Sequence, residues 1–518
     1  MIVKCTEDFQ VTWENQSDVG LNWNWDKMHN PRPVPPLAGD ITARMNGRVF
    51  GSRLVLLNGY VFSQGDGFPS PTPEVIERGV LPVWENEYEP RISEACLRWR
   101  TTDYSRMSAS ELVDLLDDII DEAGEMFLLT MVVVMAFGLP TNQFADFCEV
   151  ELGTDGPQVA AALLQGYENM SAGGGNGLGA LAKSAMRSPE VAKAIFEGRY
   201  DDLSSVDGGA TFLGELRTYL DEYGWRTDFW GQIHVPTWAE DPGTPLMLIG
   251  RYISDSAASP DAAVQRSVAQ REAAEKEAER RLTNDKLERF RELAQKAHAH
   301  VRISESRAFW QLTIDGSLRV PILALGRKLV DLGALETAED IMYLTLPEAA
   351  SVARDGSGDH RGIVATRRSD LVRWETLRPP AYVGAPRAET PEAFRKAIDR
   401  FTGGDVAASD DEAVVNGNGA AKGFARGTAR VIMTLAEGDR LQQGDILVCP
   451  STAPPWTPLF AIASAVVTDT GGILSHSAIC AREYGIPCVA GTKVGTRKIP
   501  DGAMITVDGG AGTVRIES

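Results

Sequence analysis

The residues best suited to chemistry lie in one stretch, residues 468–487, which reads TDTGGILSHSAICAREYGIP. The pattern predicts the end of a strand, two glycines, and a helix that begins at His476. Gly471 and Gly472 allow backbone N–H groups to approach a ligand closely. A helix N-terminus attracts anions through its free N–H groups and its dipole. The stretch is therefore typical of a site at which the imidazole of His476 carries a phosphoryl group.

Three further side chains of the stretch could stabilise phosphoryl charge. Thr470 and Ser475 would add hydroxyl donors, and Arg482 would add a cation nearly two turns along the helix. The alternative is a capped helix with an incidental histidine, because a Gly-Gly pair before a helix is common. Spacing alone leaves both interpretations open.

The same stretch resembles the phosphohistidine signature of the mobile, swivelling domain of phosphoenolpyruvate-utilising enzymes. That group includes phosphoenolpyruvate synthase, pyruvate phosphate dikinase, rifampicin phosphotransferase and phenylphosphate synthase. The resemblance covers residues 422–518 and includes GFARGTARVI, GDILV, PPWTPL and DGGAGTV. It implies a small C-terminal β/α swivelling domain in which His476 is the phosphorylated residue.

The preceding region resembles the acceptor-binding domain of the rifampicin phosphotransferase and phenylphosphate synthase branch. The segments that carry this likeness are residues 224–226, 238–242, 304–310, 325–335 and 339–345. The fold implied is multidomain α+β, with a large, mainly helical acceptor-binding domain over residues 1–401. No barrel follows the swivelling domain, so we expect an acceptor other than pyruvate.

The resemblance also implies a partner. No Gly-rich nucleotide loop precedes the Trp-rich stretch at residues 23–29. We therefore expect a separate ATP-binding, ATP-grasp-like subunit to phosphorylate His476, as in the split phenylphosphate synthases. Mg²⁺ is expected with ATP at that partner, and no metal site is expected in this chain.

Composition separates two regions and suggests a tether between them. Residues 402–421 are rich in Gly, Ala, Asn and Asp, which favours a flexible linker. Residues 422–518 carry nine basic and eight acidic side chains, whereas residues 1–421 have a net charge of -22. Two separately folded units, residues 1–401 and 422–518, would explain this contrast.

The net charge of -21 argues against binding to nucleic acid or to an anionic membrane. The longest apolar run, residues 126–137, is too short to cross a bilayer. The six cysteines include no CxxC pair and show no zinc spacing. These features predict a reduced, cytoplasmic protein.

Local patterns predict several helices. Apolar periodicity indicates a helix over residues 109–123, with Ser108 and Glu111 forming a capping box. A charged helix is expected over residues 261–306, and a separate one over residues 319–332. The glycine-rich residues 171–179 favour a flexible loop between helices.

Residues 224–234 are a candidate acceptor site, since they combine aromatic rings with Arg226 and His234. An aromatic pocket with few polar groups suits a flat, mostly apolar acceptor. The family often has histidine where this chain has Trp225, which puts a shared acceptor base in doubt. The alternative is that Trp225 and Trp230 are core residues.

The function expected is that of a two-step phosphotransferase. The partner passes the β-phosphoryl group of ATP to His476, and the domain swings to the acceptor domain. There a hydroxyl of a phenol or another hydroxylated aromatic compound attacks the phosphorus, which would place the enzyme in aromatic compound metabolism. The alternative of a different class is a phosphohistidine carrier or regulatory binding protein without small-molecule transfer.

Overall fold

A computed structural model describes residues 2–517 except 5–8, 14, 28, 66–68, 154–155, 165–169, 255–259, 357, 386–398, 401, 405 and 408. The chain forms two compact units. Unit 1 contains residues 1–135, 229–236 and 310–389, and unit 2 contains residues 136–228, 237–309 and 390–518. This division differs from the expected single domain over residues 1–401, because much of that region groups with the C-terminal residues.

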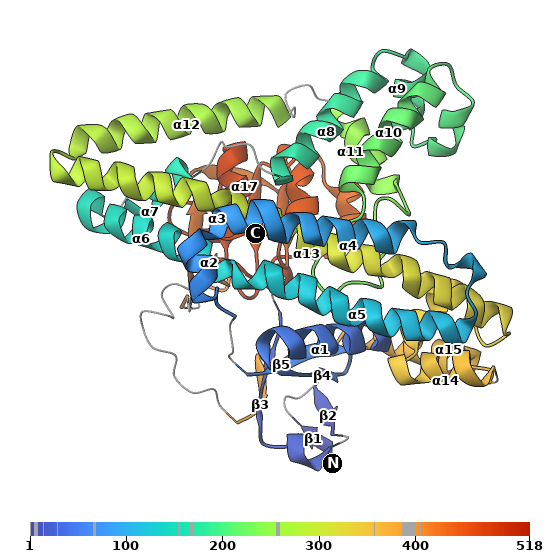
Figure 1. The fold of residues 1–518 in the computed structure, drawn as a ribbon. Coiled ribbons are helices and arrows are strands. Elements are labelled where there is room, and N and C mark those ends of the chain that lie inside the picture. Colours follow the sequence, from blue (N-terminus) through green and yellow to red (C-terminus); the bar gives the residue numbers. More distant parts are fainter. Residues whose placement is uncertain are drawn as a thin grey trace. The chain divides into compact units, whose positions relative to one another are not determined.

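Unit 1 combines a small antiparallel sheet with helices. The sheet order is β4-β5-β3-β6, and β1 pairs with β2 separately. The strands are β1 (Ile2–Lys4), β2 (Gln10–Thr12), β3 (Asn22–Trp25), β4 (Arg53–Leu57), β5 (Tyr60–Gln64) and β6 (Tyr382–Gly384). The helices are α1 (Pro36–Phe50), α2 (Pro73–Arg78), α3 (Val80–Val83), α4 (Glu89–Thr101), α5 (Ala109–Val132), α14 (Leu346–Asp355) and α15 (Arg361–Trp374). Helix α1 packs on β4 and against α5 (Figure 1).

The predicted capping box is confirmed at the start of α5. Ser108 Oγ accepts from the backbone N–H of Glu111, and the Glu111 carboxylate accepts from the N–H of Ser108 at 2.8 Å. These two bonds satisfy N–H groups that a helix start leaves open, so the helix begins where the sequence places it. Among the described residues, no helix is both long and apolar enough to cross a membrane.

The first part of unit 2 is helical. Its helices are α6 (Val134–Leu152), α7 (Gly156–Leu163), α8 (Met170–Ala185), α9 (Pro189–Phe196), α10 (Gly209–Tyr223), α11 (Gly243–Ser254) and α12 (Pro260–Arg281). Helix α13 (Asp285–Asp331) follows, and its residues 285–309 belong to this unit. The expectation of separate helices over 261–306 and 319–332 is wrong. The break lies instead before Asp285, where Asn284 has a φ of 50°, and α13 continues through Pro321 to end near Gly333.

The expected flexible loop over residues 171–179 is also wrong, because these residues lie within α8. Their glycines allow neighbours to pack against the helix backbone. A Cβ atom on Gly173 would stand 2.8 Å from Tyr223 Oη, and one on Gly177 would stand 2.7 Å from the ring of Tyr219. Close packing against α10 therefore stabilises a helix that glycine composition disfavours.

The C-terminal part of unit 2 is an eight-stranded sheet in the order β7-β14-β13-β9-β10-β11-β12-β8. Strands β9 to β12 are parallel neighbours, and the remaining pairs are antiparallel. The strands are β7 (Val414–Asn416), β8 (Asn418–Ala421), β9 (Phe424–Val431), β10 (Ile446–Cys449), β11 (Ala465–Thr468), β12 (Cys488–Ala490), β13 (Met504–Asp508) and β14 (Thr513–Ile516). All side chains of β10 and β11 are buried, as expected for central parallel strands.

The expected linker over residues 402–421 needs correction. Residues 414–416 and 418–421 form β7 and β8, which close the two edges of the sheet. Their composition is that of a coil, but pairing with β14 and β12 supplies the backbone hydrogen bonds that order them. The multidomain α+β class, with a small C-terminal β/α domain, is confirmed.

Candidate active site

The carboxyl ends of two neighbouring parallel strands position the candidate site. Strand β10 leads into residues 450–453 and the 3-10 helix η9 (Pro454–Ala461), and β11 leads into the Gly-Gly loop and α17 (His476–Tyr484). Because parallel neighbours end at the same edge of a sheet, the two loops meet there. His476 is the first residue of α17, as predicted, and Gly485 closes the helix with a φ of 68°.

The imidazole of His476 is partly buried, and side chains of η9 and α17 lie close to it. Its Nε2 atom lies 3.3 Å from Thr457 Oγ1 on η9 and 3.3 Å from Cys480 Sγ, one turn along α17. The ring of Phe460 meets the imidazole edge-on, with 6.5 Å between ring centroids. These contacts fix the ring plane and place only weakly polar groups at Nε2.

The pKa of His476 is lowered from its ordinary value of 6.5, chiefly because burial disfavours the charged imidazolium. The charge of Arg226 acts in the same direction. The charge of Glu305 and a hydrogen bond to the backbone of Ala453 act in the opposite direction. The imidazole is therefore neutral near pH 7, which is the form that acts as a nucleophile.

The Gly-Gly loop is held tightly from both sides. Gly471 has a φ of 109°, and its N–H donates to the carbonyl oxygen of Thr402 at 3.0 Å. A Cβ atom on Gly471 would stand 2.8 Å from Ser475 Oγ. The Leu474 N–H donates to the carbonyl oxygen of Arg400 at 2.6 Å. The two glycines thus serve close packing of the loop against Arg400 and Thr402.

The other predicted phosphoryl-stabilising groups make structural hydrogen bonds. Thr470 Oγ1 donates to the carbonyl oxygen of Pro450 at 3.2 Å, and Ser475 Oγ accepts from the N–H of Ala478 as the helix cap. Arg482 Nη1 donates to two backbone carbonyls, those of Ala420 and Ile473, at 2.7 and 2.9 Å. Their contact with a phosphoryl group stays a prediction.

Two charged residues from the helical part of unit 2 act on His476. Arg226 follows α10, Glu305 lies on α13, and both are buried. The pKa of Glu483 on α17 is raised to about 8, chiefly by burial and to a smaller extent by the charge of Glu305, while the charge of Arg482 acts to lower it. The candidate site therefore combines groups from the C-terminal domain and from the helices of the same unit.

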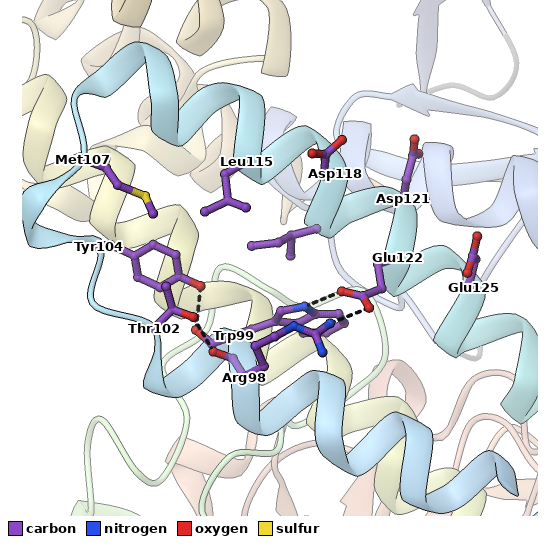
Figure 2. A pocket seen from close by; sticks show the side chains of 11 residues that line it. Arg98, Trp99, Thr102, Tyr104, Met107, Leu115, Asp118, Asp121, Glu122 and Glu125 are labelled. Atoms are coloured by element: carbon purple, nitrogen blue, oxygen red, sulfur yellow. Dashed lines mark hydrogen bonds and ion pairs between the residues drawn. The ribbon is translucent and has the colours of Figure 1, made fainter.

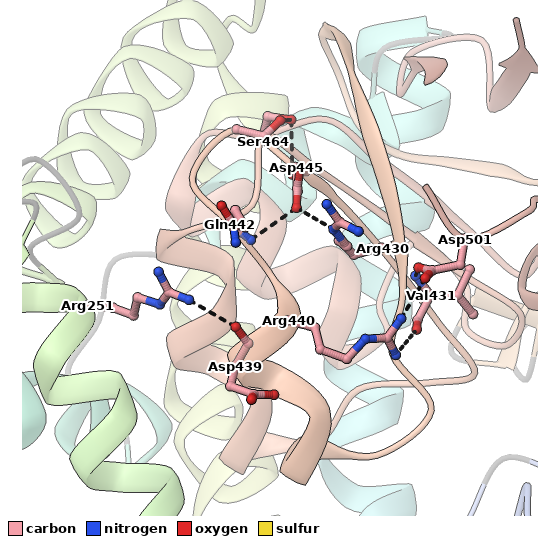
Figure 3. A network of polar contacts seen from close by, with 10 residues as sticks. Arg251, Arg430, Val431, Asp439, Arg440, Gln442, Asp445, Ser464 and Asp501 are labelled. Atoms are coloured by element: carbon pink, nitrogen blue, oxygen red, sulfur yellow. Dashed lines mark hydrogen bonds and ion pairs between the residues drawn. The ribbon is translucent and has the colours of Figure 1, made fainter. Parts of the chain in front are cut away.

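Polar contacts hold the C-terminal domain against these helices. We call this the docked arrangement of the domain. Arg251 Nη2 on α11 donates to the carbonyl oxygen of Asp439 in the 3-10 helix η8 (Leu435–Arg440) at 2.9 Å (Figure 3). Ser267 Oγ on α12 donates to the carbonyl oxygen of Glu483 at 2.9 Å. Helix α12 packs against α17, and α8 packs against η9. The docked domain therefore presents His476 to the helices of unit 2.

The predicted acceptor residues belong to different units. Trp225 and Arg226 lie in unit 2, whereas His234 lies in unit 1. Burial, with the charges of Arg319 and Arg32, lowers the pKa of His234 to about 3. The ring of Trp230 stacks on that of Phe127 in unit 1, with centroids 4.9 Å apart. Trp230 is thus a core residue, which is one of the two interpretations left open by the sequence.

Sequence reasoning did not single out Thr457, Cys480 or Glu305 as site residues. Thr457 lies in the PPWTPL segment, and Glu305 lies in the segment over residues 304–310. Because both segments resemble those of the phosphoenolpyruvate-utilising enzymes, that resemblance could have indicated Thr457 and Glu305 as candidate site residues. Cys480 could have been found from its position one turn after His476 on the predicted helix.

A cavity of about 530 Å³ lies in unit 1 between α4 and α5 (Figure 2). Several of its lining side chains are carboxylates, namely Asp118, Asp121, Glu122 and Glu125. Glu122 already accepts from Trp99 Nε1 at 2.9 Å and pairs with Arg98. This wall would repel a phosphoryl group, so the cavity is not a candidate for phosphoryl transfer.

Within the part of the chain that the structure describes, no group of three or more His, Cys, Asp and Glu side chains is arranged to hold a metal ion. The cysteines at positions 96, 148, 449, 480 and 488 are free and buried, and Cys5 lies outside the described residues. The described surroundings of His476 therefore offer hydrogen-bonding groups and one cation, but no metal-ligand set.

Two protein families match parts of the chain. Residues 441–512 match the mobile domain of PEP-utilising enzymes, and residues 130–305 match the fourth domain of rifampicin phosphotransferase. The first match contains His476, Thr457 and Cys480. The second contains Arg226 and Glu305. Both sides of the candidate site thus fall within matched regions.

Three relatives have sequences that are similar over most of the chain. It is 31% identical to chondramide synthase cmdD of Chondromyces crocatus, over 98% of this chain and 14% of that protein. It is 30% identical to a rifampicin phosphotransferase of Streptomyces sp., over 92% of this chain and 58% of that protein. It is 28% identical to the uncharacterized phosphotransferase YvkC of Bacillus subtilis, over 89% of this chain and 56% of that protein. The chain spans less than two thirds of each of these relatives. With its mobile domain and its rifampicin phosphotransferase-type domain, the chain is similar to phosphoenolpyruvate-utilising enzymes of the rifampicin phosphotransferase branch.

Proposed function

We propose that this chain is the phosphoryl-carrying and acceptor-binding part of an ATP-dependent phosphotransferase. His476 receives a phosphoryl group and passes it to a hydroxyl of a small molecule. The observation that carries this proposal is the position of His476, a neutral imidazole at the start of α17 in a mobile domain docked on a domain of the rifampicin phosphotransferase type. The printed names of the relatives support phosphoryl transfer as the reaction class.

In the transfer step, the acceptor oxygen attacks the phosphorus of phosphorylated His476. The P–N bond breaks, its electron pair returns to the imidazole, and a P–O bond forms. The hydroxyl proton needs a base, and Glu305 is the carboxylate whose charge acts on His476. We propose Glu305 for this role, because a carboxylate can accept a proton from an oriented hydroxyl group.

The acceptor is proposed to be a phenol or another hydroxylated aromatic compound. The support is the aromatic character of the helical part of unit 2 near the site. Tyr223, Trp238 and Phe309 surround Arg226, and Phe460 lies beside His476. Aromatic walls bind flat rings by apolar contact and stacking.

The phosphoryl group is proposed to come from ATP bound with Mg²⁺ by a separate ATP-grasp-like subunit. In the docked arrangement, the mobile domain presents His476 to the helices of unit 2. Phosphorylation of His476 by the partner would therefore take place in a second position of the mobile domain. The isolated chain should then neither bind ATP in calorimetry nor release AMP. ATP-dependent turnover by the pure chain would contradict this part of the proposal.

The central experiment separates charging from transfer. Phosphoramidate, a small-molecule donor that phosphorylates imidazoles, loads the full chain without a partner. The loaded chain is then mixed with a panel of phenols and aliphatic alcohols. We expect one acid-labile phosphate per chain and its loss to a phenol as an aryl phosphate. His476→Ala should abolish loading, whereas His300→Ala, on the charged helix α13, should leave it unchanged.

The second candidate function, a phosphohistidine carrier without small-molecule transfer, gives a different result. A carrier would load on His476 and keep its phosphate in the presence of every hydroxyl compound. The domain match over residues 130–305 favours an acceptor-binding enzyme, since a carrier needs only the mobile domain. Loading of the His476→Ala variant would contradict both candidates.

A further inference from the structure

Arg226 is a buried cation that has no counter-ion among the described residues. Its side chain is 4% exposed, and its Nε–H donates to the carbonyl oxygen of Tyr223 at 3.0 Å. Nη1 has no hydrogen-bond partner among the described residues, and no described carboxylate lies within ion-pair distance of the guanidinium. An unpaired buried charge is costly, so a position that keeps one calls for an explanation.

Three aromatic rings surround the guanidinium. Its central carbon lies 5.2 Å from the ring centroid of Phe309, 5.6 Å from that of Tyr223 and 5.8 Å from that of Trp238. Cation–π contacts of this kind stabilise a positive charge without using its N–H groups. The rings therefore orient the guanidinium and leave Nη donors available for an anion.

Helix α8 connects this cation to the phosphohistidine candidate. A Cβ atom on Gly174 would stand 3.3 Å from Arg226 Nη2, and one on the next residue, Gly175, would stand 3.7 Å from Tyr484 Oη on α17. Helix α8 also packs against η9, which carries Thr457 at the imidazole of His476. Arg226 and helix α17, which begins at His476, thus both lie against α8, and the charge of Arg226 reaches the imidazole of His476.

We propose that Arg226 binds the phosphoryl oxygens of phosphorylated His476 while the mobile domain is docked. This inference rests on the proposed function and assigns Arg226 to the phosphoryl group rather than to the acceptor. A guanidinium suits the task because its planar N–H donors match two phosphoryl oxygens. It stays protonated throughout: the P–N bond breaks, the P–O bond forms, and Arg226 only offsets charge on the transferred group.

The test is a ³¹P NMR titration of the full chain loaded with phosphoramidate. A nearby cation stabilises the dianionic phosphoryl group, so it lowers the pH at which that group takes up its proton. Arg226→Gln should raise this midpoint by about one pH unit and slow discharge to a phenol about 100-fold. Arg226→Lys should give an intermediate shift, because it keeps the charge and loses the paired donors.

The matched control is Arg187→Gln, which removes an exposed arginine of unit 2 that pairs with Glu215. It should leave the midpoint unchanged. If Arg226→Gln carries phosphate on His476 with the wild-type midpoint, Arg226 does not bind the phosphoryl group and the proposed function is untouched. If wild-type His476 takes up no phosphate, the proposed function and this inference fail together.

A variant that does not fold leaves the inference testable in the wild-type chain. The midpoint of the folded, loaded protein is compared with that of the same phosphoprotein unfolded in urea, in which Arg226 and His476 are separated. The folded protein should show the lower midpoint. Equal midpoints would overturn the proposal.

Discussion

Gly472 and Arg400 lie in direct backbone contact, although 72 positions separate them in the sequence. A Cβ atom on Gly472 would stand 2.5 Å from the carbonyl oxygen of Arg400, which already accepts the N–H of Leu474. The loop that precedes His476 is thus packed against the chain segment that leads into the mobile domain. The position of His476 depends on this contact.

Replacing Gly472 by alanine should disturb this contact. The added methyl group must displace backbone atoms, which costs about 1–3 kcal/mol of the free energy of unfolding. Loading of His476 by phosphoramidate should fall as the loop moves. The control is Gly214→Ala on α10, where a Cβ atom meets nothing within 4 Å and helix propensity favours alanine by up to about 1 kcal/mol. Urea unfolding that ranks the two variants equally would contradict the prediction.

Arg400 should hold the chain segment that precedes the mobile domain against α6. Its buried guanidinium donates to Asn142 Oδ1 at 2.8 Å and to Asp146 at 2.6 Å, both on α6. Arg400→Gln should free the segment that follows, so limited proteolysis within residues 403–413 should become several-fold faster. Arg426→Gln, which removes an exposed arginine of the mobile domain, should not change the cleavage rate. Equal rates in both variants would show that Arg400 does not hold the segment.

The lowered pKa of His476 predicts the pH dependence of its loading. The nucleophile is the neutral imidazole, and burial extends its range to lower pH. The rate of phosphorylation by phosphoramidate should therefore fall at a pH below 6.5, and below the corresponding midpoint for free histidine under the same conditions. Glu305→Gln should lower the midpoint further, because it removes a charge that favours the imidazolium. A midpoint above that of free histidine would contradict this assignment.

Glu483 should make docking depend on pH. Its carboxyl has a pKa of about 8, against an ordinary value of 4.5, because it is buried and because Glu305, on the helical side of the docked domain, adds a second negative charge. Between these two values the docked domain holds a proton that the free domain releases, so docking should weaken as pH rises from about 4.5 to about 8. Energy transfer between dyes on α12 and on the mobile domain would measure the docked fraction. In Glu483→Gln this dependence should largely disappear, and an unchanged profile would exclude Glu483 as its source.

The parts of the structure that the sequence predicted well are those set by local pattern. Strands β11 and β12 are short, fully buried runs of mostly apolar residues, which is the local pattern typical of central strands. Helix α17 begins at His476 and ends before Gly485, since a serine cap and a left-handed glycine mark its ends. The position of the candidate nucleophile could therefore be predicted.

The missed parts depend on partners distant in the sequence. Residues 414–421 become strands only because β14 and β12 lie beside them. Arg226, which follows α10, and Tyr484 on α17 both lie against α8. Neither composition nor periodicity can predict contacts of this kind between distant segments. The position of His476 at the start of α17 was predictable, whereas the groups that face it from the helices of unit 2 were not.

The glycines of α8 have a consequence for how the catalytic cycle is ordered in time. Each of them weakens an isolated helix by about 1 kcal/mol relative to alanine, so α8 owes its order to packing against its neighbours, which include α10, α11 and, through Tyr484, the docked domain. In the proposed cycle, departure of the mobile domain for recharging removes Tyr484 and lowers the local stability of α8. Return of the loaded histidine restores it. In this cycle, α8 is best ordered while the loaded histidine is docked, which is when transfer to the acceptor takes place.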